Sequence, residues 1–112
     1  MPVIDQAIFE ELKQMSGDDF INELIDTFLE DAPKMIAEIK SASDKQDADA
    51  FRRAAHSMKS NANTFGATQL AILAKDLEML GKENKLADSG GKLQVLEEAY
   101  QSVSEELKGL KS

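Results

Sequence analysis

The sequence contains no cysteine and no tryptophan, and it holds only one histidine among 112 residues. Without cysteine, disulfide bonds and thiolate metal sites are excluded, and a reducing compartment such as the cytoplasm is the expected location. No apolar run approaches the roughly 20 residues that a membrane-spanning helix needs. The first residues also lack the basic start and the apolar stretch of a signal peptide. We therefore expect a cytoplasmic protein that does not enter the membrane.

Basic residues are outnumbered, because 13 Lys and Arg oppose 21 Asp and Glu and the net charge is −8. Nucleic-acid binding requires an extended basic surface that displaces counterions, so no nucleic-acid partner is expected. One stretch differs from the rest, since no acid occurs between Asp49 and Asp76. A basic island of this size suits a single phosphoryl group better than a nucleic acid.

Apolar residues recur at spacings of three and four along most of the chain, which predicts amphipathic helices rather than strands. We expect a short helix over about residues 5–15 and a long helix that begins at Asp18. The apolar phase of the long helix continues across Pro33, although proline costs about 3 kcal/mol in a helix interior. One long kinked helix is therefore favoured over two, with a polar turn over 41–46 behind it.

Three further helices complete the set. The third covers 47–65, and Gly66 then joins it tightly to a fourth helix that is expected to end at Gly81. A polar loop over 82–91 precedes the last helix, which extends to about residue 110.

Amphipathic helices joined by short loops favour an antiparallel bundle. The predicted fold is all-α, an up-and-down four-helix bundle over about 18–110 with a short extra N-terminal helix as a cap. The length of the chain suggests a single domain over 1–112.

The only histidine, His56, lies on the third predicted helix, on the face opposite its apolar stripe. At about 100° per residue, His56 points roughly 140° away from the centre of that stripe. The imidazole is therefore expected in water, while Met58 is expected in the core. The stripe consists of Phe51, Ala55, Met58, Ala62 and Phe65.

Cations and small polar residues surround His56 on its own face. The neighbours within about 60° around the helix are Arg52, Lys59, Ser60 and Asn63. Arg52 and Lys59 are expected to disfavour a charged imidazole and to hold an incoming phosphoryl group. Arg53 lies at the edge of this face.

A hairpin folded at Gly66 places the fourth helix beside this site. It sets His56 opposite residues 75–79, so Lys75 and Glu78 are the residues of that helix most able to reach it.

The residues His56-Ser-Met58-Lys59-Ser60-Asn-Ala, with Phe-Gly66-Ala behind them, resemble the signature of histidine-containing phosphotransfer (HPt) domains. That family's pattern is a histidine, an apolar residue two places on, then lysine and small residues, with a glycine about ten positions after the histidine. Ser60 stands where many members carry glycine, and Asn61 stands where a smaller residue is common. The resemblance covers nearly the whole chain, because the expected helical layout is also that of the family.

The resemblance implies a monomeric module of a multistep phosphorelay. His56 would accept a phosphoryl group from a receiver-domain aspartate of a response regulator or a hybrid sensor histidine kinase, and pass it to another receiver. The module would be a carrier without kinase or phosphatase activity of its own. It would bind no cofactor, because the Mg²⁺ needed for transfer would belong to the receiver.

Other types of site fit the residues less well. A di-metal site in a helical bundle wants a Glu-x-x-His pair, and Arg53 stands three places before His56, so no metal site is expected. A hydrolase triad needs a carboxylate near the histidine, and none is expected beside Ser57 and Ser60. No glycine-rich phosphate loop is present.

Two other classes of helical protein could carry a histidine of this kind. The dimerisation helices of histidine kinases usually carry an acid directly after the histidine and a proline soon after it, whereas here Ser57 follows and no proline occurs after Pro33. The alternative that stays open is a helical adaptor with an incidental surface histidine.

Overall fold

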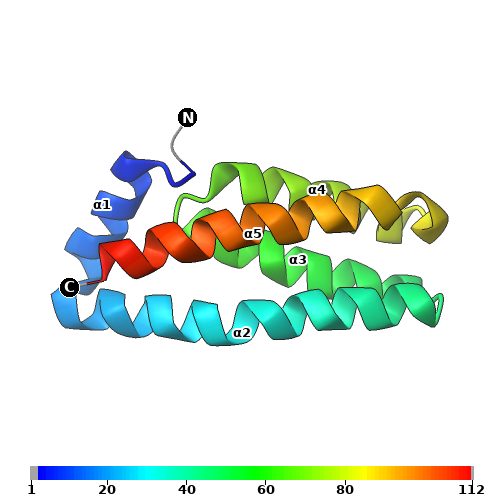
Figure 1. Ribbon diagram of the computed structural model, residues 1–112, viewed down its shortest axis with the longest axis horizontal. Coiled ribbons are helices and arrows are strands. Elements are labelled where there is room, and N and C mark those ends of the chain that lie inside the picture. The colour runs from blue at the N-terminus through cyan, green and yellow to red at the C-terminus, as the bar shows by residue number, and fades with distance from the viewer. Residues whose placement is uncertain (1–2, 112) are drawn as a thin grey trace.

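Five α-helices and one 3₁₀ turn account for most of residues 3–111, the part of the chain that the computed structural model describes. Helices α2 to α5 lie along one another as an antiparallel bundle, and α1 crosses one end of it (Figure 1). No strand occurs within residues 3–111, so the predicted all-α bundle with an N-terminal cap helix is confirmed. The elements are α1 (Gln6–Ser16), α2 (Asp18–Asp44), α3 (Ala48–Thr64), α4 (Thr68–Lys82), η1 (Leu86–Asp88) and α5 (Gly90–Leu110).

Helix α2 continues without interruption through Pro33, which confirms the prediction of a single long helix. Proline has no amide hydrogen, so the carbonyl of Leu29 loses its partner within the helix. The hydroxyl of Tyr100 on α5 donates to this carbonyl at an O···O distance of 3.5 Å. The Tyr100 ring also packs edge-on against Phe28, with 5.9 Å between the ring centroids. The Tyr100 hydroxyl on the facing helix thus supplies the hydrogen-bond donor that proline lacks.

Two predicted connections are shorter in the structure than their composition indicated. Helix α2 extends to Asp44, so most of the polar turn expected over 41–46 is wrong, and Ala42 is buried there. Helix α4 continues past Gly81 to Lys82. In the loop that follows, Leu86 is buried in η1. Buried apolar residues therefore order stretches that are otherwise polar.

Helices α3 and α4 form the most intimate pair in the bundle. A Cβ atom on Gly81 would lie 2.9 Å from the backbone nitrogen of Arg52, so the two backbones meet directly at this point. The sequence pattern predicts that the helix ends at Gly81. In the structure, the absence of a side chain at Gly81 allows α3 and α4 to pack closely. This contact fixes how α4 sits against the histidine helix.

The α3–α4 hairpin closes at Gly66, as predicted. Gly66 has a φ of +79°, a left-handed conformation that favours glycine. Its carbonyl accepts a hydrogen bond from the amide of Asp5 at 2.8 Å, and a Cβ there would lie 2.9 Å from the Asp5 carbonyl oxygen. Gly66 therefore also anchors the start of α1 to the bundle.

Candidate functional site

His56 stands on the outer surface of α3, with α2 on one side and α4 on the other. Its side chain is 56% exposed, whereas Met58 two residues later is fully buried. Both observations confirm the predicted orientation of the helix. The two sides of His56 are built differently.

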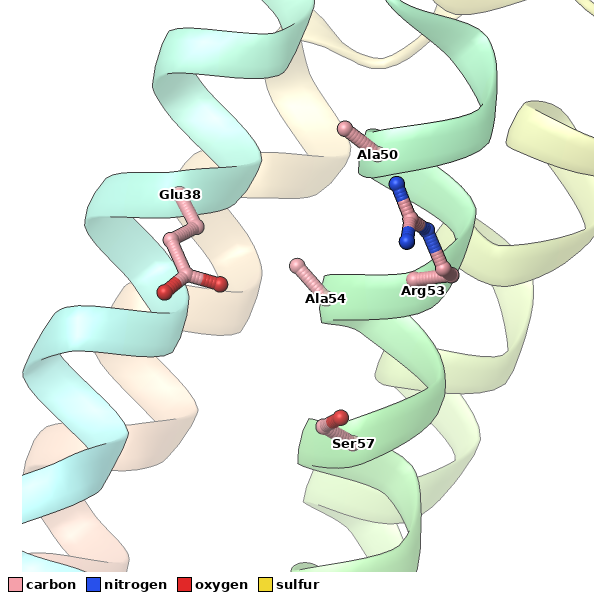
Figure 2. A pocket seen from close by; sticks show the side chains of 5 residues that line it. All are labelled: Glu38, Ala50, Arg53, Ala54 and Ser57. Carbon is pink, nitrogen blue, oxygen red and sulfur yellow. The ribbon is translucent and has the colours of Figure 1, made fainter.

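The α2 side is hollow and polar. A groove between α2 and α3 is lined by Glu38 of α2 and by Ala50, Arg53, Ala54 and Ser57 of α3 (Figure 2). We refer to these five residues as the α2–α3 groove. Alanine and serine side chains leave space there, with an acid on one wall and a cation on the other.

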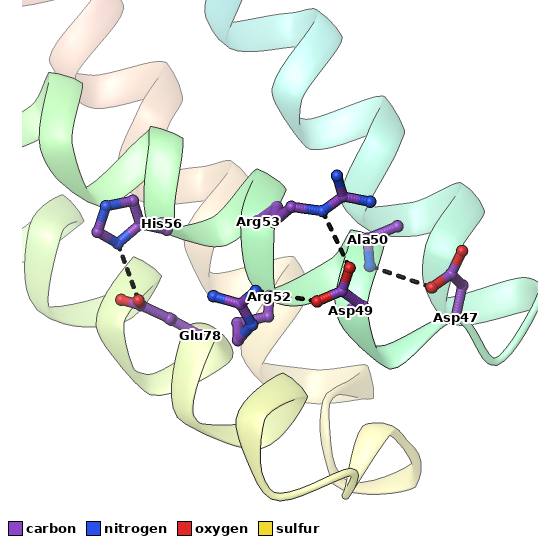
Figure 3. A network of polar contacts seen from close by, with 7 residues as sticks. All are labelled: Asp47, Asp49, Ala50, Arg52, Arg53, His56 and Glu78. Atoms are coloured by element: carbon purple, nitrogen blue, oxygen red, sulfur yellow. Dashed lines mark hydrogen bonds and ion pairs between the residues drawn. The ribbon is translucent and has the colours of Figure 1, made fainter.

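The α4 side is closed by a carboxylate. One oxygen of Glu78, Oε2, lies 2.8 Å from Nδ1 of His56, and the ring stands directly over Glu78 (Figure 3). The other oxygen, Oε1, lies 2.6 Å from the ammonium nitrogen of Lys59. Because the side chains of Glu78 and Lys59 are only 17% and 25% exposed, this arrangement is largely shielded from solvent. A single carboxylate thus holds both the histidine and the lysine of the predicted motif.

The charge state of Glu78 decides which nitrogen of the His56 imidazole carries the proton. Burial raises the pKa of Glu78, but hydrogen bonds from Lys59 and His56 outweigh burial and hold the pKa below its ordinary value. Glu78 is therefore ionised at neutral pH, and an ionised carboxylate only accepts hydrogen bonds. Nδ1 of His56 must then carry the proton. In the neutral ring this leaves the lone pair on Nε2, which has no partner within residues 3–111.

Arg52 and Arg53 belong to a second group of charges, one to two turns away. Nη2 of Arg52 lies 2.9 Å from one oxygen of Asp49, and Nε of Arg53 lies 3.2 Å from the other. The hydrogen bond from Arg52 and the charge of Arg53 lower the pKa of the Asp49 carboxyl. The basic island, which holds no acid along the sequence, is therefore partly compensated in space by Asp49 and Glu78. The spacings of three and four from Asp49 to the arginines could have indicated this pairing.

Among the described residues, the remaining predicted neighbours make no hydrogen bond or ion pair with the His56 ring. Lys59, Asn63 and Lys75 line a shallow groove between α3 and α4, together with Thr68, Ala71 and Ile72. Ser60 is exposed, and its carbonyl accepts a hydrogen bond from the Thr64 hydroxyl at 3.0 Å. Within residues 3–111, neither Asn63 nor Lys75 is bonded to His56.

The prediction that Glu78 can reach His56 is confirmed, and the expectation that a hydrolase triad would lack a carboxylate near the histidine is therefore wrong. Glu78 is 22 residues further along the chain, and the α3–α4 hairpin brings it to the ring. Among the described residues, neither Ser57 nor Ser60 hydrogen-bonds to the imidazole, so no activated hydroxyl completes a hydrolase triad. The carboxylate orients a ring whose other nitrogen faces outward.

Two other kinds of feature are absent from the part of the chain that the structure describes. Residues 3–111 hold no cluster of three or more His, Cys, Asp or Glu side chains placed to bind a metal ion. None of the helices in this range combines the length and the apolar character that a bilayer crossing requires.

Comparisons with known proteins point in one direction. The family model described as "Hpt domain" matches residues 23–106. The chain is similar to the phosphorelay protein LuxU of Vibrio harveyi, with 28% identity over 88 residues that cover 79% of this chain and 77% of that protein. The structure of this chain is similar to the crystal structure of histidine-containing phosphotransfer protein B (HptB) from Pseudomonas aeruginosa PAO1. That match has a TM-score of 0.92 and 26% identity, and it covers 98% of this chain and 95% of the other.

Proposed function

Because this chain belongs to the Hpt domain family, we propose that His56 is the residue on which it carries a phosphoryl group. The role of the chain is that of a phosphotransfer intermediate in a phosphorelay. The observation that supports His56 most strongly is its geometry. The ring is exposed, Nδ1 is bound to Glu78 at 2.8 Å, and Nε2 faces outward.

In the proposed reaction, the Nε2 lone pair of His56 attacks the phosphorus of a phosphorylated aspartate on a receiver domain. A P–N bond forms as the P–O bond to the aspartate breaks, and the aspartate leaves as a free carboxylate. Nδ1 keeps its proton throughout, so the ring becomes a phosphoimidazolium cation. The negative charge of Glu78 compensates this new positive charge where it develops. A protonated ring is also a good leaving group, which favours onward transfer to the next receiver.

For Lys59 we propose a role other than holding the phosphoryl group directly. Its ammonium is bound to Glu78 rather than free beside the ring, which supports a part in fixing the carboxylate. The carboxylate in turn orients the imidazole. Lys59 would thus be a positioning residue that acts through Glu78.

The partners implied by this chemistry are receiver domains, either of response regulators or of a hybrid sensor histidine kinase. We propose that the chain works as a monomer in the cytoplasm, without kinase or phosphatase activity of its own. The Mg²⁺ that assists transfer would be held by the receiver, and we assign no residue of this chain to bind it.

A phosphotransfer assay tests the assignment. A receiver domain carrying ³²P on its aspartate is mixed with the parent chain or with the His56→Gln variant. The parent should gain acid-labile label, and the variant should gain none, because it lacks the nucleophile. Circular dichroism should show equal helix content, since His56 is exposed and off the core face. Equal labelling of the variant contradicts the role of His56, and an unlabelled parent with every receiver of a panel favours the helical adaptor.

A further inference from the structure

The side of the bundle between α4 and α5 takes no part in the site described above. The helices contact one another in the order α2, α3, α4, α5 and back to α2, so this side lies across the bundle from the α2–α3 groove. Helices α4 and α5 run antiparallel along it (Figure 1). A protein bound on this side would leave His56 open to a receiver.

The surface is hollowed where the first turn of α4 faces α5. The hollow has a volume of about 350 Å³, and Gln69 of α4 and Ala99 and Ser102 of α5 are among the residues that line it. Because the helices are antiparallel, seven residues forward from Gln69 correspond to seven residues back from Ser102. Asp76 on α4 and Val95 on α5 therefore lie at similar heights, about 10 Å further along the same side.

Large apolar side chains are exposed beside this hollow. Ile72 and Met79 of α4 and Val95 of α5 are 54%, 40% and 48% exposed, and they are three of the five large apolar side chains exposed among residues 3–111. At about 100° per residue, Ile72 and Met79 lie within about 20° of each other on the outermost part of α4. Val95 lies four residues before Ala99 and thus on the side of α5 that faces α4.

Unpaired acids accompany these apolar side chains. Asp76 lies seven residues after Gln69 and therefore on the side of α4 that faces α5. Glu98 and Glu105, also seven residues apart, follow the outermost line of α5. Among the described residues, no hydrogen bond or ion pair joins any of these three carboxylates to a partner. We refer to the apolar and acidic residues together as the α4–α5 face: Ile72, Asp76, Met79, Val95, Glu98 and Glu105.

The other charges near the α4–α5 face leave it acidic. Lys75 lines the groove toward α3, and Lys82, seven residues on, lies on the same side of α4. Glu83 and Glu106 are already bonded within the chain. Lys92 is a cation in the first turn of α5, at one end of the face. An acidic surface repels nucleic acids and anionic lipid headgroups, and it attracts a cationic partner.

We propose that the α4–α5 face binds a cationic amphipathic helix of a partner protein. The apolar residues of that helix would lie on the exposed apolar side chains, and its Lys or Arg residues would meet the unpaired acids. From Gln69 to Met79 the face is about 15 Å long, which accommodates about three turns of a helix. Because the face lies across the bundle from the α2–α3 groove, the chain can hold this partner and a receiver at the same time.

A model peptide tests the charge requirement. The probe is a fluorescent helical peptide of Leu and Lys with leucine along one face, and its control has Glu in place of Lys. The parent should bind the Lys peptide and not the Glu peptide in fluorescence anisotropy. Glu98→Lys with Glu105→Lys should weaken binding by about tenfold or more. Glu23→Lys with Glu30→Lys makes the same change of net charge at two exposed acids seven residues apart on α2, and it should weaken binding less than about twofold. Equal losses in the two double variants, or no binding by the parent, overturn the proposal.

A second pair of variants tests the apolar requirement. Ile72→Ser with Val95→Ser should weaken binding of the Lys peptide by about tenfold, whereas Met15→Ser with Phe20→Ser removes two exposed apolar side chains elsewhere and should change it less than about twofold. Amide NMR shifts caused by the peptide in the parent should lie on α4 and α5, and shifts confined to α2 and α3 overturn the face. Self-association of the parent that Ile72→Ser with Val95→Ser abolishes would identify a second copy as the occupant and overturn the partner helix.

Transfer in the presence of the peptide tests whether both partners can bind together. At saturating Lys peptide, the rate of transfer from a ³²P-labelled receiver to His56 should stay within about twofold of the rate without peptide. A peptide that blocks transfer would show that the two surfaces overlap, and would overturn the proposal. A chain that binds the peptide on α4 and α5 but is labelled by no receiver contradicts the proposed function and supports the α4–α5 face, so the two can fail separately.

Discussion

Two pairs of helices in this bundle are held together in different ways. Helices α3 and α4 meet backbone to backbone, where Gly81 leaves only the space of a hydrogen beside Arg52. Helices α2 and α5 are kept apart by aromatic rings, with Tyr100 edge-on to Phe28, and surface ion pairs such as Lys40 with Glu97 bridge them. The closer contact occurs in the helix pair that carries the site, because His56 lies on α3 and Glu78 lies on α4.

A site that depends on a 2.8 Å contact between two helices needs those helices at a fixed spacing. Backbone contact provides this, since a backbone cannot change rotamer as a side chain can. The α2–α5 pair supports the core but brings no reacting group into place. It can therefore tolerate a proline and a longer hydrogen bond. The predictions below change each pair in turn and compare the consequences.

The largest effect is expected from Gly81→Val. The new side chain meets the backbone of Arg52, which cannot move aside without shifting α3 against α4. We expect a loss of about 3 kcal/mol in the free energy of unfolding, at the upper end of the range for overpacking. Phosphoryl transfer by the folded variant should also slow, because Glu78 lies less than one turn from Gly81 and is displaced from His56. Urea unfolding and the ³²P assay measure the two effects.

The matched control is Gly109→Val in α5. A Cβ at Gly109 meets nothing within 4 Å, so stability should stay within about 0.5 kcal/mol of the parent. Equal losses in the two variants would mean that valine disturbs any helix here, and that close α3–α4 packing is not the cause.

Helical periodicity predicts the core face of α3 well, because burial repeats along one element. The exposure of His56 and the burial of Met58 follow from it, and both are observed. Contacts between elements depend on spacing that periodicity does not contain. The hairpin at Gly66 indicates that Glu78 can reach His56, but not that its carboxylate bonds to the ring. Gly81 has the composition of a helix end, and only the neighbouring helix shows its use in packing.

An intermediate effect is expected at Glu78, the residue that links the two helices of the site. Glu78→Ala removes the partner of Nδ1, so the ring is free to take the other tautomer and loses a compensating charge. We expect transfer to slow by about ten- to a hundredfold, equivalent to about 1.4–2.7 kcal/mol in the barrier. Glu78→Gln keeps an acceptor oxygen, and it should retain the tautomer while losing part of the rate.

Imidazole ¹⁵N NMR distinguishes positioning from a general loss of structure. The parent and Glu78→Gln should show a protonated Nδ1 and an unprotonated Nε2, and Glu78→Ala should show a mixture. A ring that keeps the parental tautomer in Glu78→Ala would show that Glu78 does not orient it.

The pH dependence of stability has a definite sign at the same residue. The folded state lowers the pKa of Glu78, so the resulting stabilisation is fully present above the ordinary carboxyl pKa and is lost as the pH falls through the lowered value. Unfolding midpoints of the parent and of Glu78→Gln, measured from neutral to acid pH, should therefore converge toward the acid end. A gap that widens on acidification would contradict the direction of the shift.

The smallest effect concerns the α2–α5 pair. Burial raises the pKa of Tyr100, so its phenol stays protonated and donates to the Leu29 carbonyl that Pro33 leaves without a partner. Tyr100→Phe removes only this hydroxyl and should cost about 1 kcal/mol of stability, with transfer at the parental rate because the site lies on the other helix pair. Pro33→Ala restores an amide that can bond Leu29 within α2, so Tyr100→Phe should cost less in that background. Thermal or urea unfolding of the parent, the two single variants and the double variant gives the coupling between the residues. If the two changes are additive, the hydroxyl does not serve the carbonyl freed by the proline, and the tolerance of α2 for Pro33 must come from packing alone.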